Sequence, residues 1–326
     1  MSTLKRSIEA NSLLELSRYL KPMISICIPT FNRCEYLDYL LANIFLEVDA
    51  NSEMYEVVVS DNCSTDKTLD VVRKFQDKSL NLRYSRSYKN FGADRNIRNS
   101  IMAASGRFCW IMGDDDAFRQ GALGLVAKYL ETHNPDISIS DRYMCDLELN
   151  VLSYTPFIID DAPFLIFDCL QRENMIEYFQ RVKSTIGMFN FISILVVRRS
   201  SWLSAPEAPG MSQSIFPHIY KIIDMMRNQG AKLLFINEPT VFARDNPRME
   251  EITGNSEFRN WQVHFKGNIE IADHFFSDDP VAYSAFLSPI KNIISPAIQH
   301  YLILAEKEDS TVEALLTLKK LGIEYT

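Results

Sequence analysis

The sequence has no long hydrophobic run. No stretch approaches the roughly 18 apolar residues that a membrane-spanning helix needs. The first 20 residues form a charged, leucine-containing amphipathic pattern that lacks the apolar core of a signal peptide. We therefore expect residues 1–22 to be an N-terminal amphipathic segment and the protein to remain in the cytoplasm.

Cysteines and histidines at metal-ligand spacing are also missing. The six cysteines are scattered without a C-x-x-C pair, and two lie inside strand-like runs, which indicates reduced thiols. The five histidines include no H-x-x-x-H spacing. This pattern disfavours a zinc site.

Positive charge is in deficit. Lysine and arginine total 34 against 42 acidic residues, which gives a net charge of -8. Because binding to a phosphate backbone needs a basic face, we expect no nucleic-acid partner. The 326 residues, 47% of them hydrophobic, allow one large domain with an appendage, or two domains.

The first half of the chain contains strand-like segments that alternate with helix-like ones. This order is typical of an α/β fold with a mostly parallel sheet flanked by helices. The expected strands are residues 23–28, 56–60, 82–86 and 108–112, and the expected helices are residues 35–46, 66–77, 94–104 and 117–130.

Three of these strands, at residues 23–28, 56–60 and 108–112, end in polar residues, and the last of the three ends in three adjacent carboxylates. Asp114, Asp115 and Asp116 repel one another unless a cation or several donors lie among them, and a divalent metal that carries a substrate phosphate fits this need. The simpler interpretation is that Asp116 caps helix 117–130 while its neighbours are solvated. Ligands of open α/β sheets bind beyond the carboxyl ends of strands, which favours one shared site.

The motifs at these strand ends resemble those of the family-2 glycosyltransferases with the GT-A fold. Residues 26–33 resemble V-x-I-P-T-x-N-R, residues 58–68 resemble V-V-D-D-G-S-T-D-x-T, and residues 90–116 resemble the N-x-G…A-R-N…D-x-D-D region. The resemblance covers about residues 23–130. The variants in these motifs and residues 237–244 are similar to the abequosyltransferase-type branch, which decorates bacterial surface polysaccharides.

The resemblance implies a nucleotide-sugar donor and a divalent metal, Mn²⁺ or Mg²⁺. It implies that Asp115 and Asp116 contact the metal or the ribose of the donor, with Asp116 in the catalytic machinery. Gly113 takes the place where many relatives have the first aspartate, so Asp114 is an additional carboxylate near the donor. Such a metal stabilises the departing diphosphate.

Further donor-binding positions follow from the same resemblance: Pro29, Thr30, Asn32, Arg33, Asp61, Asn62 and Arg95. Asp61 matches the acidic position that binds the nucleoside, and Asn62 replaces the usual second aspartate. Arg95 could neutralise donor phosphate or orient Asp115. The alternatives are an Asx turn at residues 61–62 and a solvated helix charge at Arg95.

The catalytic base is harder to place. The second half suggests a strand at residues 190–198, a helix at 215–228, and a strand at 232–243 interrupted by Glu238 and Pro239. In relatives an acidic pair before such a segment carries the base, but here that place falls at Pro217 and His218. His218 could be the base, or it could be a satisfied, partly buried histidine, and a retaining enzyme would need no such base.

The chain after residue 250 is helical, with expected helices at residues 258–276, 281–306 and 311–321, the middle one bent by Pro289 and Pro296. Their apolar face is expected to pack on the catalytic domain. It could also form a homo-oligomer contact or lie on a membrane surface. We therefore expect a catalytic domain at 23–250, with donor half 23–130 and acceptor half 131–250, and a helical region at 251–326.

Together these features suggest a metal-dependent hexosyl- or deoxyhexosyltransferase. It would move a sugar from a nucleotide-diphosphate donor to a hydroxyl of a glycan or lipid-linked oligosaccharide, at the inner face of the cytoplasmic membrane, during O-antigen or capsule synthesis. One alternative is a sugar nucleotidyltransferase, which Pro-Thr-Phe-Asn-Arg in place of a Gly-rich phosphate loop disfavours. The other is a non-catalytic nucleotide- or glycan-binding relative, because the acidic pair is missing.

Overall fold

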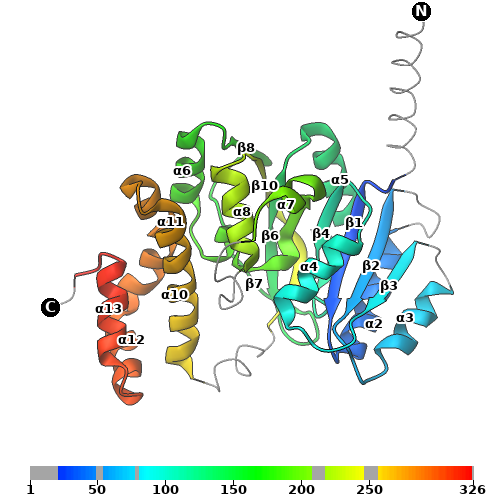
Figure 1. Ribbon diagram of the computed structural model, residues 1–326, viewed down its shortest axis with the longest axis horizontal. Coiled ribbons are helices and arrows are strands. Elements are labelled where there is room, and N and C mark those ends of the chain that lie inside the picture. The colour runs from blue at the N-terminus through cyan, green and yellow to red at the C-terminus, as the bar shows by residue number, and fades with distance from the viewer. Residues whose placement is uncertain (1–20, 49–53, 78–80, 208–216, 246–255, 325–326) are drawn as a thin grey trace, which may run out of the picture. The chain divides into compact units, whose positions relative to one another are not determined.

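The computed structural model describes residues 21–48, 54–77, 81–207, 217–245 and 256–324 (Figure 1). The chain divides into two compact units. Unit 1 consists of residues 1–132 and 196–203, and unit 2 of residues 133–195 and 204–326. Apart from Lys21 and Pro22, the N-terminal segment expected at residues 1–22 lies outside the described residues.

Unit 1 is built on a parallel sheet. Strand β1 (Ile24–Thr30) pairs in parallel with β2 (Tyr55–Asp61) on one side and with β4 (Phe108–Ile111) on the other. Strand β3 (Leu82–Arg86) extends the sheet beyond β2, and β9 (Leu195–Arg198) borders β4. The central strands are buried along nearly their whole length because helices cover both faces of such a sheet.

The connecting helices follow the predicted order. They are α2 (Cys34–Glu47), α3 (Thr68–Gln76), α4 (Ala93–Ala103) and α5 (Ala122–His133) (Figure 1). One boundary was wrong, because the expected helix at 117–130 begins at Ala122, after a two-residue strand β5 (Ala117–Phe118). Asp116 therefore does not cap that helix, and the simpler interpretation of this residue is wrong.

Unit 2 contains a mixed sheet. Strand β6 (Ile137–Cys145) pairs in parallel with β10 (Lys232–Arg244) and antiparallel with β7 (Val151–Tyr154), while β8 (Phe164–Asp168) pairs antiparallel with the other edge of β10. Strands β6, β7 and β8 and helix α6 (Arg172–Arg181) were not predicted from the sequence. Strand β10 continues through Pro239, where the expected interruption becomes two register shifts against β6.

The predicted strand at 190–198 is shorter in the structure. A π-helix η1 (Ile186–Asn190) and a 3₁₀-helix η2 (Ile192–Ile194) precede β9. Inside η1 the buried Phe189 has φ 70°, a backbone conformation that side-chain-bearing residues rarely adopt. Helix α7 (Arg199–Ser204) then follows β9 directly.

The C-terminal helices pack within unit 2. Helix α10 (Glu257–Phe276) contacts α8 (Pro217–Arg227), α11 (Pro280–Ile294), α12 (Ile298–Lys307) and α13 (Thr311–Lys320). The expected helix at 281–306 is broken at η4 (Ser295–Ala297), which contains Pro296, whereas Pro289 lies inside α11. Among the described residues, no helix is both long enough and apolar enough to cross a bilayer.

Candidate functional site

The three consecutive aspartates follow β4 in unit 1, and an arginine from the end of β1 meets them. Nη1 of Arg33 lies 3.2 Å from Oδ1 of Asp114 and 2.5 Å from Oδ2 of Asp115. Asp114 and Asp116 are buried, and the side chain of Arg33 is only 12% exposed. Arg33 is thus a cationic partner of the acidic cluster, whereas the sequence had predicted only that it binds the donor.

The electrostatics of this group favour a permanent charge on the arginine. Burial acts to lower the pKa of the Arg33 guanidinium, but the charges of Asp114 and Asp115 outweigh burial, so the net pKa is raised. A guanidinium between two carboxylates offsets their mutual repulsion, and its fork can bond both. Removal of Arg33 would leave the negative charges of Asp114 and Asp115 without this positive partner.

The carboxylates also fit a divalent cation in part. Carboxylate oxygens are the ligands that Mg²⁺ and Mn²⁺ prefer. Among the described residues, however, no group of three or more His, Cys, Asp and Glu side chains is arranged to hold a metal ion. A metal at Asp115 and Asp116 would therefore need ligands from elsewhere, such as phosphate oxygens.

Asp61, at the end of β2, is buried and held by protein groups. Its Oδ1 accepts from the backbone N–H of Ser64 at 2.7 Å, and its Oδ2 accepts from the hydroxyl of Tyr84 at 2.6 Å. Nε of Arg86 lies 3.3 Å from the same Oδ2. The local contacts include the Asx-type bond that the alternative interpretation expected, and they fix the turn after β2.

Asn62 ties the end of β2 to the loop before α4. Its Nδ2 donates to Oδ1 of Asn90 at 2.7 Å and to the carbonyl of Gly92 at 3.1 Å. Its Oδ1 accepts from the backbone N–H of Phe91 at 2.9 Å. An aspartate in this place could accept but not donate, so the amide explains how this loop is held.

Asn96, in α4, bonds to the ends of two strands and was not predicted from the sequence as a site residue. Its Nδ2 donates to the carbonyl of Thr30 at 3.1 Å and to the carbonyl of Ser60 at 2.9 Å, while its Oδ1 accepts from the hydroxyl of Ser60. This buried amide in α4 therefore joins the carboxyl ends of β1 and β2. The only sequence signal was its place in the Arg-Asn pair after Gly92.

Asn32 and Asp66 connect the two loops that follow β1 and β2. Asn32, at φ 52°, accepts from the N–H of Thr65 at 2.7 Å, and its own N–H donates to the hydroxyl of Ser64. Asp66 accepts from the N–H of Cys34 at 2.9 Å. Pro29 lies just before this junction, within β1. The strand ends expected to share a site are thus cross-linked in unit 1.

Arg95 lies on the exposed side of α4. Its guanidinium carbon is 4.6 Å from the ring centroid of Phe91, a cation–π geometry, and Phe91 belongs to the loop held by Asn62. Lys89 stacks on the same ring at 5.1 Å. Two cations are therefore presented by the loop and helix that follow β3.

His218 lies at the start of α8 in unit 2 and is buried. Its Nε2 is 2.9 Å from the carbonyl oxygen of Phe189, and because a carbonyl can only accept, Nε2 carries the proton. Burial lowers the pKa of His218 to about 4, so the imidazole is neutral at neutral pH. Nδ1 is then the nitrogen that carries the lone pair.

Asp141, in β6, is another buried titratable group of unit 2, and it was not predicted from the sequence. It accepts from the hydroxyl of Tyr154 at 2.8 Å and from the N–H of Phe157 at 3.0 Å. Burial raises the pKa of Asp141 to about 6. Its neighbours in the sequence, Ile-Ser-Ile-Ser before and Arg-Tyr-Met after, gave no motif by which to find it.

The family comparison agrees with the motifs and the fold. The model named "Glycosyl transferase family 2" matches residues 25–202, more than half of the chain. Abequosyltransferase RfbV of Salmonella typhimurium is 31% identical over 269 residues, which cover 81% of this chain and 78% of that protein. The chain belongs to glycosyl transferase family 2, in its abequosyltransferase-like branch.

Solved structures give the same fold at low sequence identity. The crystal structure of S. aureus TarS 1–349 in complex with UDP matches with a TM-score of 0.64 at 16% identity, covering 91% of this chain and 79% of that one. Mannosyltransferase PcManGT from Pyrobaculum calidifontis, in complex with GDP-Man and Mn²⁺, matches with a TM-score of 0.54 at 14% identity. The match covers 93% of this chain and 87% of that one. The fold is therefore GT-A, as the motifs predicted.

Proposed function

We propose that this glycosyltransferase moves a sugar from a nucleotide-diphosphate donor to a hydroxyl of a glycan or lipid-linked oligosaccharide, in the assembly of a bacterial surface polysaccharide such as O-antigen. The observation that carries the proposal is the meeting of Arg33 with Asp114 and Asp115 at the carboxyl ends of β1 and β4. The name of the abequosyltransferase relative supports glycosyl transfer, and the UDP and GDP-Man complexes support a nucleotide-diphosphate donor.

The donor would bind beyond the carboxyl ends of β1, β2 and β4. Pro29 and Thr30 end β1 and Asn32 follows it, and we assign these three residues to the nucleoside together with Asp61 and Asn62. The contacts of Asp61 and Asn62 to Tyr84 and Asn90 suggest that both shape the binding loops in addition to any direct contact. Arg95 and Arg33 would supply positive charge toward the diphosphate.

Departure of the nucleotide leaves negative charge on its diphosphate, and the catalytic requirement is to stabilise that charge. Asp115 and Asp116 would hold Mn²⁺ or Mg²⁺, which supplies a Lewis acid to the leaving phosphate. Arg33 would exchange a carboxylate contact for a phosphate contact, because a guanidinium bonds either anion. Asp114 would keep Arg33 oriented.

The attacking hydroxyl needs a proton acceptor if the reaction inverts the anomeric centre. We retain His218 as the candidate base, acting through Nδ1. Its low pKa disfavours this role, since a weak base abstracts a proton less readily, and its bond to Phe189 occupies Nε2. His218→Ala should lower kcat far more than donor affinity if the imidazole is the base, whereas an equal loss of both indicates a structural role.

The test combines binding and turnover. UDP, GDP, CDP and dTDP are screened with and without Mn²⁺ by thermal shift, since a ligand that binds only the native state raises Tm. Asp116→Ala should abolish the Mn²⁺-dependent shift and lower turnover of the matching nucleotide sugar. Asp38→Ala, which alters an exposed carboxylate paired with Lys74, is the control. Unchanged binding and turnover in Asp116→Ala would refute the proposal, and binding without turnover in the wild type would leave a non-catalytic relative.

A further inference from the structure

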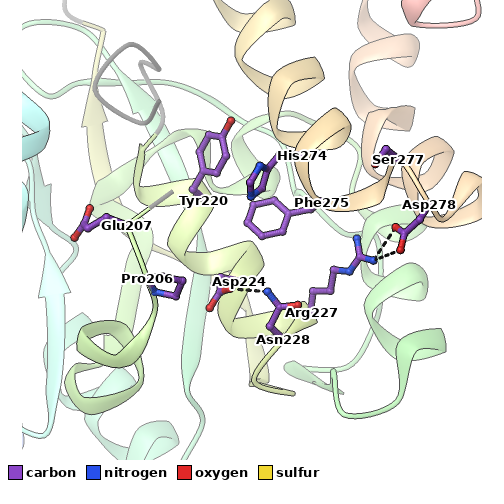
Figure 2. Close-up of a pocket in the computed structure, with 10 residues that line it drawn as sticks. All are labelled: Pro206, Glu207, Tyr220, Asp224, Arg227, Asn228, His274, Phe275, Ser277 and Asp278. Atoms are coloured by element: carbon purple, nitrogen blue, oxygen red, sulfur yellow. Dashed lines mark hydrogen bonds and ion pairs between the residues drawn. The ribbon is translucent and has the colours of Figure 1, made fainter. Parts of the chain in front are cut away.

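A cavity of about 560 Å³ lies in unit 2, between α8, the residues after α7, and the end of α10 (Figure 2). Tyr220, Asp224 and Arg227 line it from α8, Asn228 from the turn after α8, and His274 and Phe275 from the last turn of α10. Its volume is within the range of small-molecule sites. Neither the acidic cluster nor any other residue assigned to the donor lines it.

One wall of the cavity is aromatic. The ring of Tyr220 lies 5.4 Å from that of His274 and 5.7 Å from that of Phe275, and His274 and Phe275 are 4.6 Å apart. Figure 2 shows the three rings grouped together, above Asp224 and Asn228 in this view. His274 is exposed, whereas Tyr220 and Phe275 are largely buried. This wall offers C–H and π surface to a ring-shaped ligand.

The lining next to the aromatic rings is polar and preorganised, with Asp224 one helical turn after Tyr220 on α8. Asp224 is only 6% exposed, and its Oδ1 and Oδ2 accept from the side-chain amides of Asn228 at 2.6 Å and Gln229 at 3.0 Å. These bonds fix the orientation of a buried carboxylate. A carboxylate oxygen has more than one acceptor position, so Asp224 can accept further hydrogen bonds from a ligand hydroxyl.

The charges around the cavity are largely paired. Arg227 bonds Asp278 at 2.8 Å, as Figure 2 shows, and Glu207 lies 3.3 Å from Nζ of Lys221. Asp224 differs from these residues because its hydrogen-bond partners are the neutral amides of Asn228 and Gln229. A nucleotide or phosphate would need cations beyond Arg227, which already contacts Asp278. The charge balance instead suits an uncharged ligand that is rich in hydroxyl donors.

We propose that this cavity binds one uncharged pyranose unit of a glycan. The ring would lie against Tyr220 and His274, and its hydroxyls would donate to Asp224 and accept from Asn228. The assignment of this sugar to the acceptor glycan rests on the proposed function. The enzyme would then hold its acceptor at a second point, distinct from the donor residues.

The experiment uses the full-length protein and saturation-transfer NMR. The probes are the methyl glycosides of glucose, galactose, mannose, rhamnose and N-acetylglucosamine. Ser277→Trp places an indole in the cavity and should weaken binding of the best probe at least tenfold. Asp224→Asn keeps the shape but removes the charge, and should weaken binding about tenfold, as expected for a charge-assisted hydrogen bond. Thr132→Trp, an exposed position on α5, is the matched control and should bind normally.

Nucleotide binding separates this inference from the proposed function. Thermal shifts with UDP, GDP, CDP and dTDP should be the same in Ser277→Trp and wild type. The inference is overturned if no glycoside binds the wild type, if Ser277→Trp binds the best probe as well as Thr132→Trp does, or if Ser277→Trp loses nucleotide binding. Failure of every nucleotide to bind the wild type would instead count against the proposed function, while glycoside binding could still stand.

Discussion

Nη1 of Arg33 lies 2.5 Å from Oδ2 of Asp115, and this contact joins the residue that follows β1 by three positions to the cluster that follows β4. The two residues are 82 positions apart in the sequence. The contact therefore shows that the carboxyl ends of the parallel strands β1 and β4 lie next to each other. Together with the contact of Arg33 to Asp114, it offsets the repulsion between two of the three adjacent carboxylates.

Arg33→Ala should destabilise the protein by about 3 kcal/mol, because it leaves largely buried carboxylates without their arginine. We expect Mn²⁺ or Mg²⁺ to restore part of that loss, since a divalent cation would supply the missing positive charge. Urea unfolding with and without metal measures both effects. Lys74→Ala, which breaks an exposed pair with Asp38, should cost less than about 1 kcal/mol and show no metal dependence. A metal effect equal in the two variants would argue against a cation site at the aspartates.

Asn62→Asp should cost about 2 kcal/mol. The carboxylate loses both donated bonds and faces the oxygens of Asn90 and Gly92, although it still accepts from the N–H of Phe91. Urea unfolding gives the stability, and amide hydrogen exchange at Phe91 and Gly92 should become faster. Asn150→Asp, which alters an exposed amide bonded to Asp146, is the control and should change stability by less than about 1 kcal/mol. Unchanged exchange at residues 91–92 would show that the amide does not hold this loop.

His218 should make stability depend on pH. Its pKa falls from the ordinary 6.5 to about 4 on folding, so above the ordinary value both states are neutral. As the pH falls below about 6.5, the unfolded chain binds a proton that the folded chain does not, and stability decreases until about pH 4. We expect this group to lower stability by about 2 kcal/mol between about pH 8 and about pH 5.

His218→Gln isolates that contribution, because its amide can still donate to the carbonyl of Phe189 while it cannot titrate. Unfolding free energies of the variant and wild type, measured across this pH range, should converge at low pH. Thr132→Gln, at an exposed position without a titrating side chain, is the control and should leave the pH profile unchanged. Parallel profiles for wild type and His218→Gln would mean that His218 is not buried in its neutral form.

Gly106→Ala should cost about 2 kcal/mol or more. A Cβ at this glycine would lie 2.5 Å from Oγ and 2.9 Å from the backbone nitrogen of Ser25, so strand β1 would have to move. Gly124→Ala, inside α5 with nothing within 4 Å of the added atom, should instead stabilise by about 0.5–1 kcal/mol. Thermal or urea unfolding of both variants checks the contrast, and equal effects would contradict the close approach at Gly106.

The sequence by itself determined the alternating strands and helices of unit 1, the family, and the acidic cluster. Those features are local: continuous apolar runs mark strands buried on both faces, and motif residues stand at fixed spacing after them. The same reasoning missed β6, β7 and β8. Their short or mixed patterns, with β7 fully exposed, do not differ enough from a loop for periodicity to detect them.

Only the tertiary structure decided which groups meet. Arg33 with Asp115, Asn62 with Asn90, and Asn96 with the ends of two strands are contacts between distant positions, and hydrogen bonding depends on distance and angle that no spacing rule supplies. Burial, which also depends on the tertiary structure, decided the protonation state of His218. A lone histidine in a sequence is compatible with a base or a structural donor, and here the low pKa follows from exclusion of water around the ring.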